Sequence, residues 1–424
     1  MIREFDFEKL PIVEVVNEIL VDSSVRGASD IHFDPLENVL KIRIRIDGQL
    51  VDYATIPNHL KRNLITRIKI IAGMNITETR LPQDGAIKAN IKNTPLDLRV
   101  SSLPTINGEK IVIRILDYTA SAKGIEYLGF REKNFEKLKK MIHTPNGIIL
   151  VTGATGTGKS TTVYSILQKI NKQEVNLVTV EDPIEMDIEG INQVQVNSDI
   201  NLTFANVLRS ILRQDPDIIM IGEIRDDETA KIAVRASVTG HLVLSTLHTN
   251  NSLNTIERLL DMNVERYLLA SALYGIISQK LARKLCDKCK VKRSTTPYEK
   301  RLFMNVLGKQ VDEVYTSHGC NECGNGFKGR IAIHEVLLIN QQIRDAISDG
   351  IKKEKLRELV YTDDVDTLLQ DGLYKVLEGY TTIEEILNRI EDDIHTSNDF
   401  IIAKKKEIED IKQDTEKLEN LILE

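Results

Sequence analysis

Apolar and polar residues alternate along the first part of the chain. In the stretch LKIRIRIDGQL, the isoleucines at 42, 44 and 46 fall on one face of a strand and the arginines between them on the other. The Asp47-Gly48 pair that follows predicts a tight hairpin turn. Ile12 to Val25 has a helical pattern, and LDLRVSSLP and KIVIRILD repeat the strand pattern. Residues 1–117 are therefore predicted to form a small α+β domain.

From Ile125 to about Glu391 the pattern changes, because wholly apolar strands now alternate with helical segments. The strands read GIILVTG, NLVTVED, DIIMIGE and HLVLSTL. This alternation is typical of a largely parallel sheet covered by helices on both faces, which makes the fold class α/β. The small, polar stretch Tyr118 to Gly124 between the two domains is expected to be a hinge linker.

The composition narrows the class of protein further. The chain has 42% hydrophobic residues, enough to build real cores. It has no Trp, 5% aromatic residues and a net charge of −7, which argues against a nucleic-acid binder that works by base stacking or a broad basic field. Its start, MIREFDFEKL, does not resemble a signal peptide, and we find no apolar run of the roughly 18–20 residues that span a bilayer. We expect a soluble, cytoplasmic protein.

The clearest chemical motif is a phosphate-binding loop. Gly153 to Ser160 reads GATGTGKS, which matches GxxxxGK[ST], and it lies between the apolar strand Ile148 to Val151 and the helical segment Thr161 to Ile170. In this context backbone N–H groups and a helix N-terminus surround phosphate oxygens, the lysine reaches the β- and γ-phosphates, and the serine holds Mg²⁺. The residues expected to bind ATP are Gly153, Ala154, Thr155, Gly156, Thr157, Gly158, Lys159, Ser160 and Thr161.

Acidic residues and histidines follow at the ends of later strands. Glu223 closes the strand DIIMIGE, where a carboxylate can poise water against the γ-phosphate. Glu181 and Glu185, in VEDPIE, would repel one another unless a cation lies nearby, although an acidic turn facing solvent is the alternative. His241 and His248 bracket another strand and are candidates for sensing phosphate, or alternatively ordinary packed histidines.

All four cysteines occur in two CxxC pairs, Cys286/Cys289 and Cys320/Cys323. Two such pairs can close a tetrahedral S₄ site suited to Zn²⁺, whereas a redox CxxC usually occurs singly near a thioredoxin-like fold. We predict a structural zinc site in an insert at about residues 283–330.

In this order, GATGTGKST, TVEDPIE, LRQDPDIIMIGEIRD and TGHLVLSTLHT resemble the Walker A, Asp box, Walker B and His box of the type II secretion and type IV pilus ATPases. The first domain, with ASDIHFDP, TETRLPQDG and GEKIVIRIL, is similar to that family's second N-terminal domain. The resemblance covers roughly residues 10–390. It implies a RecA-like P-loop motor domain with a smaller α+β N-terminal domain, a zinc-binding insert and a C-terminal helical tail.

The resemblance also implies roles for individual residues. Lys159 and Ser160 bind phosphate and Mg²⁺, Glu181 and Glu185 form the Asp box, Glu223 is the catalytic carboxylate, and His241 and His248 lie near the γ-phosphate. Arg99 and Arg114 match arginines that the family brings onto the phosphate when its domains close. Two departures stand out: the chain begins almost at the second N-terminal domain, and Ala86 replaces an arginine that relatives often carry.

The function implied is a hexameric, cytoplasmic ATPase that couples ATP hydrolysis to assembly of a type II secretion pseudopilus or a type IV pilus. It would lie at the inner face of the cytoplasmic membrane, held by a platform protein and other machine components, with ATP, Mg²⁺ and Zn²⁺ as cofactors and no direct contact with nucleic acid. The tetracysteine insert favours extension or secretion over retraction. A nucleic-acid translocase or helicase on the same P-loop core, and an adaptor that binds ATP without hydrolysing it, are the alternatives.

The last segment, residues 392–424, is strongly charged and has a helical pattern. Ile394, Ile401, Ile408, Thr415 and Ile422 recur every seven residues, which indicates a weak coiled-coil seam broken by Ser397 and Lys404. We expect either an amphipathic helix folded on its own domain or a coiled coil with a partner.

Overall fold

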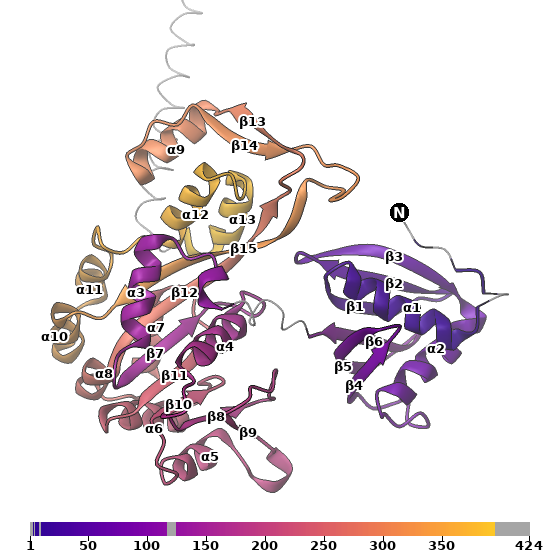
Figure 1. Cartoon of the computed structure of the whole chain (residues 1–424), viewed down its shortest axis with the longest axis horizontal. Helices are drawn as coiled ribbons and strands as arrows, with labels where there is room; N and C mark the ends of the chain where they lie inside the picture. Colours follow the sequence, from indigo (N-terminus) through magenta and orange to yellow (C-terminus); the bar gives the residue numbers. More distant parts are fainter. Residues whose placement is uncertain (1–2, 4, 8–9, 117–123, 395–424) are drawn as a thin grey trace, which may run out of the picture. The chain divides into compact units, whose positions relative to one another are not determined.

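The computed structural model describes residues 3, 5–7, 10–116 and 124–394. The chain divides into two compact units, unit 1 (Met1–Thr119) and unit 2 (Ala120–Glu424), which are coloured indigo to purple and purple to yellow (Figure 1). The predicted hinge lies outside the described residues except for Gly124, and the predicted tail lies outside them beyond Ile394. No helix within the described ranges combines the length and the apolarity needed to cross a bilayer.

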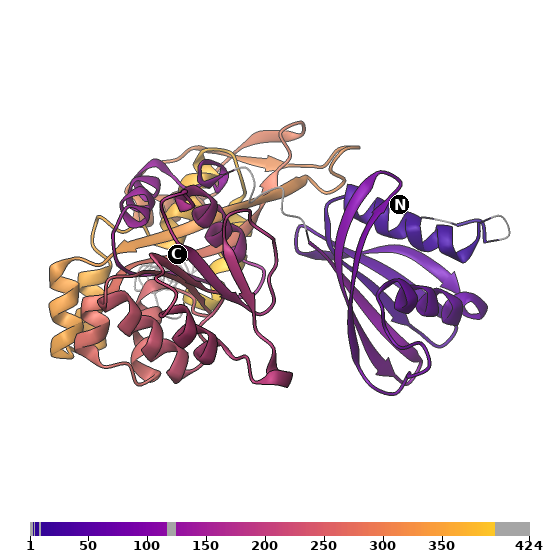
Figure 2. The same cartoon turned by 60° about the horizontal axis from the view of Figure 1, so that its bottom comes forward.

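Unit 1 is one antiparallel sheet in the order β3-β2-β1-β6-β5-β4, and its helices α1 and α2 lie together on one face (Figure 2). Its elements are α1 (Ile12–Val25), β1 (Ala28–Pro35), β2 (Val39–Ile46), β3 (Gln49–Pro57), α2 (Asn58–Ile71), β4 (Gln83–Ile91), β5 (Thr94–Thr105) and β6 (Gly108–Ile115).

The alternation read from the sequence explains how this sheet forms. Leu40, Ile42 and Ile44 of β2 are buried beneath the helices, and the residues between them are partly exposed. Asp47 and Gly48 both take positive φ values, 49° and 86°, which is the conformation of a two-residue hairpin turn. Both the strand and the turn therefore confirm the predicted hairpin.

Unit 2 is built on a seven-stranded sheet in the order β15-β12-β7-β11-β10-β8-β9, parallel except for β15. Its first elements are η2 (Ile125–Tyr127), α3 (Glu132–Ile142), β7 (Gly147–Thr152), α4 (Lys159–Ile170), β8 (Leu177–Glu181), β9 (Asn192–Gln195), η3 (Ser198–Ile200), α5 (Phe204–Ile211), β10 (Ile218–Ile221), α6 (Asp227–Val238) and β11 (Leu242–Leu247). They are followed by α7 (Ser252–Asp261), α8 (Arg266–Ala272), β12 (Leu273–Leu285), β13 (Lys290–Ser294), α9 (Pro297–Leu307), β14 (Glu313–Ser317), β15 (Phe327–Leu338), α10 (Gln341–Asp349), α11 (Lys353–Val360), α12 (Leu368–Leu377) and α13 (Ile383–Ile394).

The central strands β7, β8, β10 and β11 are buried along their whole length, as continuous apolar runs between helical layers should be. Separate hydrophobic clusters occupy the two faces of the sheet. The long strands β12 and β15 continue beyond the sheet and carry an insert made of the two-stranded antiparallel sheet β13–β14 and the helix α9 that connects its strands (Figure 1). This arrangement gives the predicted α/β fold with a cysteine-bearing insert.

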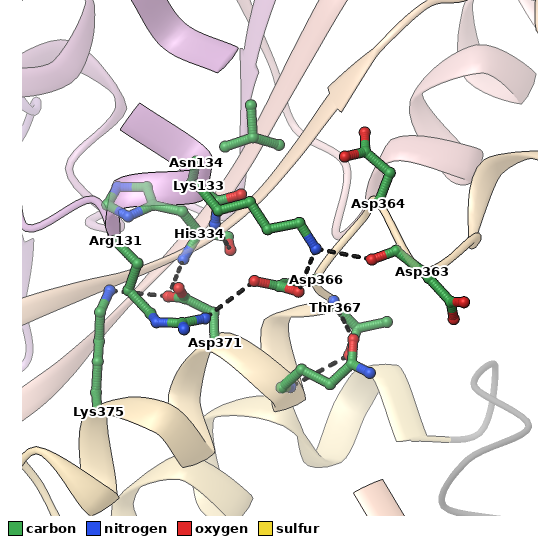
Figure 3. A network of polar contacts seen from close by, with 12 residues as sticks. Arg131, Lys133, Asn134, His334, Asp363, Asp364, Asp366, Thr367, Asp371 and Lys375 are labelled. Atoms are coloured by element: carbon green, nitrogen blue, oxygen red, sulfur yellow. Dashed lines mark hydrogen bonds and ion pairs between the residues drawn. The ribbon is translucent and has the colours of Figure 1, made fainter. Parts of the chain in front are cut away.

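A buried polar network joins β15, α12 and the segment that opens unit 2 (Figure 3). One carboxylate oxygen of Asp371 accepts the backbone N–H of His334 at 2.9 Å and the ammonium of Lys375 at 2.8 Å. At the edge of the network, the carboxylate of Asp366 accepts hydrogen bonds from the side chains of Arg131 and Lys133, each at 2.9 Å. The network therefore fixes α12 against the long strand that returns from the insert.

The His334 ring lies inside this network but takes no part in its hydrogen bonds. It is fully buried and stacks on Phe130 with ring centroids 3.7 Å apart and planes 16° from parallel. Among the described residues neither ring nitrogen finds a hydrogen-bond partner. Burial and the nearby charge of Lys375 hold the pKa of His334 well below its ordinary value of 6.5, so the ring is neutral.

Candidate nucleotide site

The phosphate-binding loop follows the carboxyl end of β7, which pairs in parallel with β11 on one side and β12 on the other. The loop turns on Gly153, Gly156 and Gly158, with φ values of 150°, 80° and 88°. At Gly153 a side chain is also excluded by space, because a Cβ atom there would lie 2.6 Å from the carbonyl oxygen of Gln279. Helix α4 begins at Lys159, so its N-terminus points its free N–H groups into the loop.

Lys159 is buried in this loop, with its ammonium group donating to the carbonyl oxygens of Gly153 at 2.8 Å and Ala154 at 3.0 Å. Burial lowers the pKa of Lys159, and the negative charges of Glu223 and Glu185 oppose that shift. Both carboxylates therefore lie close enough to act on the lysine. The structure thus brings together three of the predicted site residues, from α4, β10 and the turn after β8.

Glu223 lies just beyond the carboxyl end of β10. Strand β10 pairs with β11 in parallel, with Ile221 opposite Ser245, so the residues that follow the two strands lie side by side. One carboxylate oxygen of Glu223 is 3.3 Å from Nε2 of His248, and the other forms an ion pair with Arg225. Arg225 also lies 3.6 Å from Asp182. His248 therefore lies beside the candidate catalytic carboxylate, and its predicted place near the γ-phosphate stays a prediction.

His241 does not lie at this end of the sheet. It precedes β11, whose first residue, Leu242, is opposite Gly147, whereas the last, Leu247, is opposite Thr152 next to the loop. A strand of this length separates its two ends by roughly 20 Å. Nδ1 of His241 lies 2.9 Å from the carbonyl oxygen of Ala236 instead. The prediction that His241 lies near the γ-phosphate is therefore wrong for the site of a single chain.

The two Asp-box glutamates have different surroundings. Glu181, the last residue of β8, is only 3% exposed and is hydrogen-bonded by Tyr164, Thr179 and Gln193. Glu185 is exposed and lies where its charge acts on Lys159. Of this pair, Glu181 is therefore enclosed by protein groups, whereas Glu185 is exposed and acts on the phosphate-loop lysine.

Two residues that the sequence analysis missed hold the loop and the acidic turn in place. Gln279 of β12 donates to the carbonyl of Thr157 and accepts the hydroxyl of Thr162, both at 2.8 Å, so it connects the loop to the first turn of α4. Tyr164 of α4 reaches the Asp-box turn. The one signal in the sequence was a polar Ser-Gln pair inside the apolar run GIISQKLA.

Arg99 and Arg114 lie on the neighbouring strands β5 and β6 of unit 1, directly opposite one another. The guanidinium group of Arg114 is 3.2 Å from Asp30 and remains largely exposed. Like charges directly opposite on a sheet repel one another, and Asp30 offsets the charge of Arg114 within unit 1. The predicted contact of these arginines with phosphate stays a prediction.

The four cysteines converge at the outer end of the β12–β15 pair. Their sulfur atoms all lie within 4.8 Å of one another, with Cys289 and Cys320 each 3.5 Å from Cys323 and Cys286 4.0 Å from Cys320. Zinc–sulfur bonds of about 2.3 Å give sulfur–sulfur separations of roughly 3.8 Å in a tetrahedron. Backbone N–H groups of Glu322 and Cys323 lower the pKa of Cys320 to about 7, whereas desolvation and the neighbouring thiols raise the pKa of Cys323 to about 11, so Cys320 loses its proton before Cys323 does. The four residues fit a Zn²⁺ ion.

The fold and the nucleotide site together define a RecA-like P-loop ATPase. A family model described as type II/IV secretion system protein matches residues 6–388. The chain belongs to this family of secretion and pilus-assembly ATPases.

Individual relatives support this assignment. The chain is 46% identical to a type IV pilus assembly ATPase, PilB, of Thermus thermophilus over 376 residues, covering 88% of this chain and 42% of that protein. It is 46% identical to type II secretion system protein E of Pectobacterium carotovorum over 380 residues, covering 89% of this chain and 75% of the relative. Thus the chain spans less than half of the first relative and about three quarters of the second.

Solved structures show the same fold. The pilus retraction motor PilT with bound ADP is 26% identical, with a TM-score of 0.59, and the similarity covers 88% of this chain and 96% of that one. The ATPase DotB of Legionella pneumophila is 21% identical, with a TM-score of 0.65, and the similarity covers 91% of this chain and 96% of that one.

Proposed function

We propose that this chain is the cytoplasmic motor of a type II secretion or type IV pilus assembly machine, acting as a homohexamer. The observation that carries the proposal is the convergence of Lys159, Glu223 and His248 at the carboxyl edge of the sheet, in a chain of this family. Such a site fits hydrolysis of ATP rather than binding alone, because it supplies both a phosphate cradle and a group that can accept a proton.

In the proposed mechanism Lys159 leaves the loop carbonyls that it contacts and binds the β- and γ-phosphates. Glu223 orients the attacking water, and His248 stabilises the position of that carboxylate. Ser160 would hold Mg²⁺, which neutralises phosphate charge when bound with ATP. Glu185, whose charge acts on Lys159, would add negative charge that favours the ion.

Arg99 and Arg114 complete the site in the proposal. An arginine brought onto the γ-phosphate neutralises charge that develops as the phosphoryl group is transferred. The two arginines come from unit 1 and the P-loop from unit 2, so hydrolysis is coupled to closure of one unit on another. Around a ring of six chains, that closure becomes motion.

The machine proposed to use this motion contains a polytopic platform protein of the inner membrane. Cys286, Cys289, Cys320 and Cys323 would hold a structural Zn²⁺ in the insert, which favours extension or secretion over retraction. Binding to membrane-embedded components, rather than a membrane span of its own, would bring the chain to the inner face of the membrane.

Phosphate release by the purified full chain tests the catalytic part of the proposal. Glu223→Gln should retain ATP binding but lose about a hundredfold or more in kcat, because it removes the acceptor that poises water. Lys159→Ala should lose both binding and turnover. Glu136→Gln makes the same change of charge at an exposed residue of α3 that pairs with Lys139, and it should behave as wild type. Near-normal turnover in both site variants would refute the assignment.

Assembly and coupling need their own measurements. Native mass spectrometry with a slowly hydrolysed ATP analogue should detect six chains. Hydrolysis should rise when membranes containing the platform protein are added and should not respond to DNA. Stimulation by single- or double-stranded DNA in place of those membranes would favour a nucleic-acid translocase.

A further inference from the structure

Tyr164 connects the nucleotide-binding helix to the Asp-box turn. Its ring belongs to α4 and is buried, and its hydroxyl group donates to the carboxylate of Glu181 at the end of β8. The same oxygen accepts the backbone N–H groups of Glu185 at 3.1 Å and Met186 at 3.4 Å. A single hydroxyl group therefore holds two consecutive peptide units of the turn.

Both carboxylate oxygens of Glu181 are already engaged by neighbouring side chains among the described residues. One carboxylate oxygen takes the Tyr164 proton, and the other takes the Thr179 hydroxyl and the Gln193 amide at 3.0 Å. A buried carboxylate that accepts these three donors is well satisfied, and moving it would leave them unpaired. Glu181 also orients the Tyr164 hydroxyl group. Because the tyrosine proton points to Glu181, the lone pairs of the phenol oxygen face the N–H groups of the turn.

The hydrogen bonds of Tyr164 determine the position of Glu185 in this turn. Its side chain is exposed, and its charge acts on the ammonium of Lys159. The hydrogen bond from its own backbone N–H to Tyr164 fixes where that side chain starts. Since Tyr164 and Lys159 both belong to α4, the hydroxyl group ties the Asp-box turn to the helix that carries the lysine.

We propose that Tyr164 is a positioning residue that holds Glu185 at the nucleotide site, and that Glu181 acts through Tyr164 rather than on the nucleotide. The proposal rests on hydrolysis at this P-loop, as proposed above. It divides the two Asp-box glutamates into an inner one that orients the tyrosine and an outer one that faces the ligand.

Tyr164→Phe tests this division, because it removes one oxygen atom and keeps the ring in its packing. In the purified full chain we expect kcat to fall about tenfold, the loss corresponding to roughly one or two hydrogen bonds. KM for ATP should change less than about twofold, and the Mg²⁺ concentration for half-maximal activity should rise. Tyr53→Phe is the matched control: Tyr53 is likewise buried and donates to a carboxylate, Asp22, at 2.7 Å, but in unit 1. It should leave all three parameters unchanged.

A double-mutant cycle separates positioning from general weakening of the fold. If Tyr164 acts through Glu185, adding Tyr164→Phe to Glu185→Gln should lower kcat by less than about twofold more. Full additivity of the two changes, or wild-type kcat in Tyr164→Phe, would overturn the proposal.

Glu181→Gln provides a second variant, which keeps an oxygen that accepts the tyrosine proton. Its kcat should fall no further than that of Tyr164→Phe, and a loss equal to that of Glu223→Gln would show that Glu181 acts on the nucleotide. Failure of the proposed function looks different, because Lys159→Ala and Glu223→Gln would then retain turnover. If those two variants are inactive and Tyr164→Phe is normal, only the inference about Tyr164 is lost.

Discussion

The ion pair between Asp371 and Lys375 allows a sharp test of what holds unit 2 together. Lys375→Met removes the ammonium group but keeps most of the volume of the side chain. Among the described residues, the fully buried carboxylate of Asp371 then keeps one hydrogen bond, from the backbone N–H of His334. The carbonyl oxygen of Ala332, which Lys375 also contacts, loses that donor.

Leaving one charge of a buried pair without its partner costs about 3–5 kcal/mol. For a unit of this size such a loss lowers Tm by on the order of 6–10 °C. Differential scanning calorimetry of the full chain, with and without ATP, measures the shift. The double variant Asp371→Asn/Lys375→Met removes the charge yet keeps an oxygen for His334, so it should recover much of the lost stability. A double variant no more stable than Lys375→Met would refute the reasoning that the unpaired charge causes the loss.

Three further outcomes are expected. Burial holds the pKa of His334 well below 6.5, so below about pH 6.5 the unfolded chain binds a proton that the folded chain does not. The free energy of unfolding of unit 2 should therefore fall by up to about 1.4 kcal/mol per pH unit as the pH decreases. His334→Phe, which can keep the stack on Phe130, should flatten that slope in denaturant titrations at pH 7.5 and 5.5. Gln279→Leu removes both hydrogen bonds of the Gln279 side chain, one to the phosphate loop and one to the first turn of α4. Steady-state kinetics should therefore show a KM for ATP about tenfold higher, and an unchanged KM would exclude the bracing role. Elemental analysis should find one Zn²⁺ per chain. Cys286→Ser should lower Tm, while nucleotide affinity in a fluorescence titration stays within about twofold of wild type. A larger loss of affinity would show that the metal supports the phosphate loop directly.

The sequence predicted those features that short-range patterns determine. The alternation in β2, the hairpin at Asp47, the strand–loop–helix around Lys159 and the two CxxC pairs all follow from neighbouring residues, and the structure has each of them. The resemblance also predicted that Arg99 and Arg114 lie on neighbouring strands, and the structure confirms this position.

Features that depend on distant residues were not predictable in the same way. His241 and His248 flank one strand in the sequence, but in a parallel sheet the two ends of a strand face opposite edges, so only His248 meets Glu223. Glu181 and Glu185 look equivalent in VEDPIE, and only the approach of Tyr164 from α4 separates an inner from an outer carboxylate. Side-chain hydrogen bonds across elements leave almost no trace in local periodicity.

Strand β12 touches both chemically distinctive parts of unit 2. Near its middle Gln279 holds the phosphate loop, and directly after its last residue, Leu285, comes the first zinc-site cysteine, Cys286. Seven residues of extended chain span roughly 23 Å between these points. Pairing with β15 runs along almost the whole of this length, with one irregularity between Arg283 and Leu285, so one paired strand connects the phosphate loop to the zinc-site cysteines. Over that length, a tilt of the strand by about 5° about Gln279 would displace its cysteine end by roughly 2 Å.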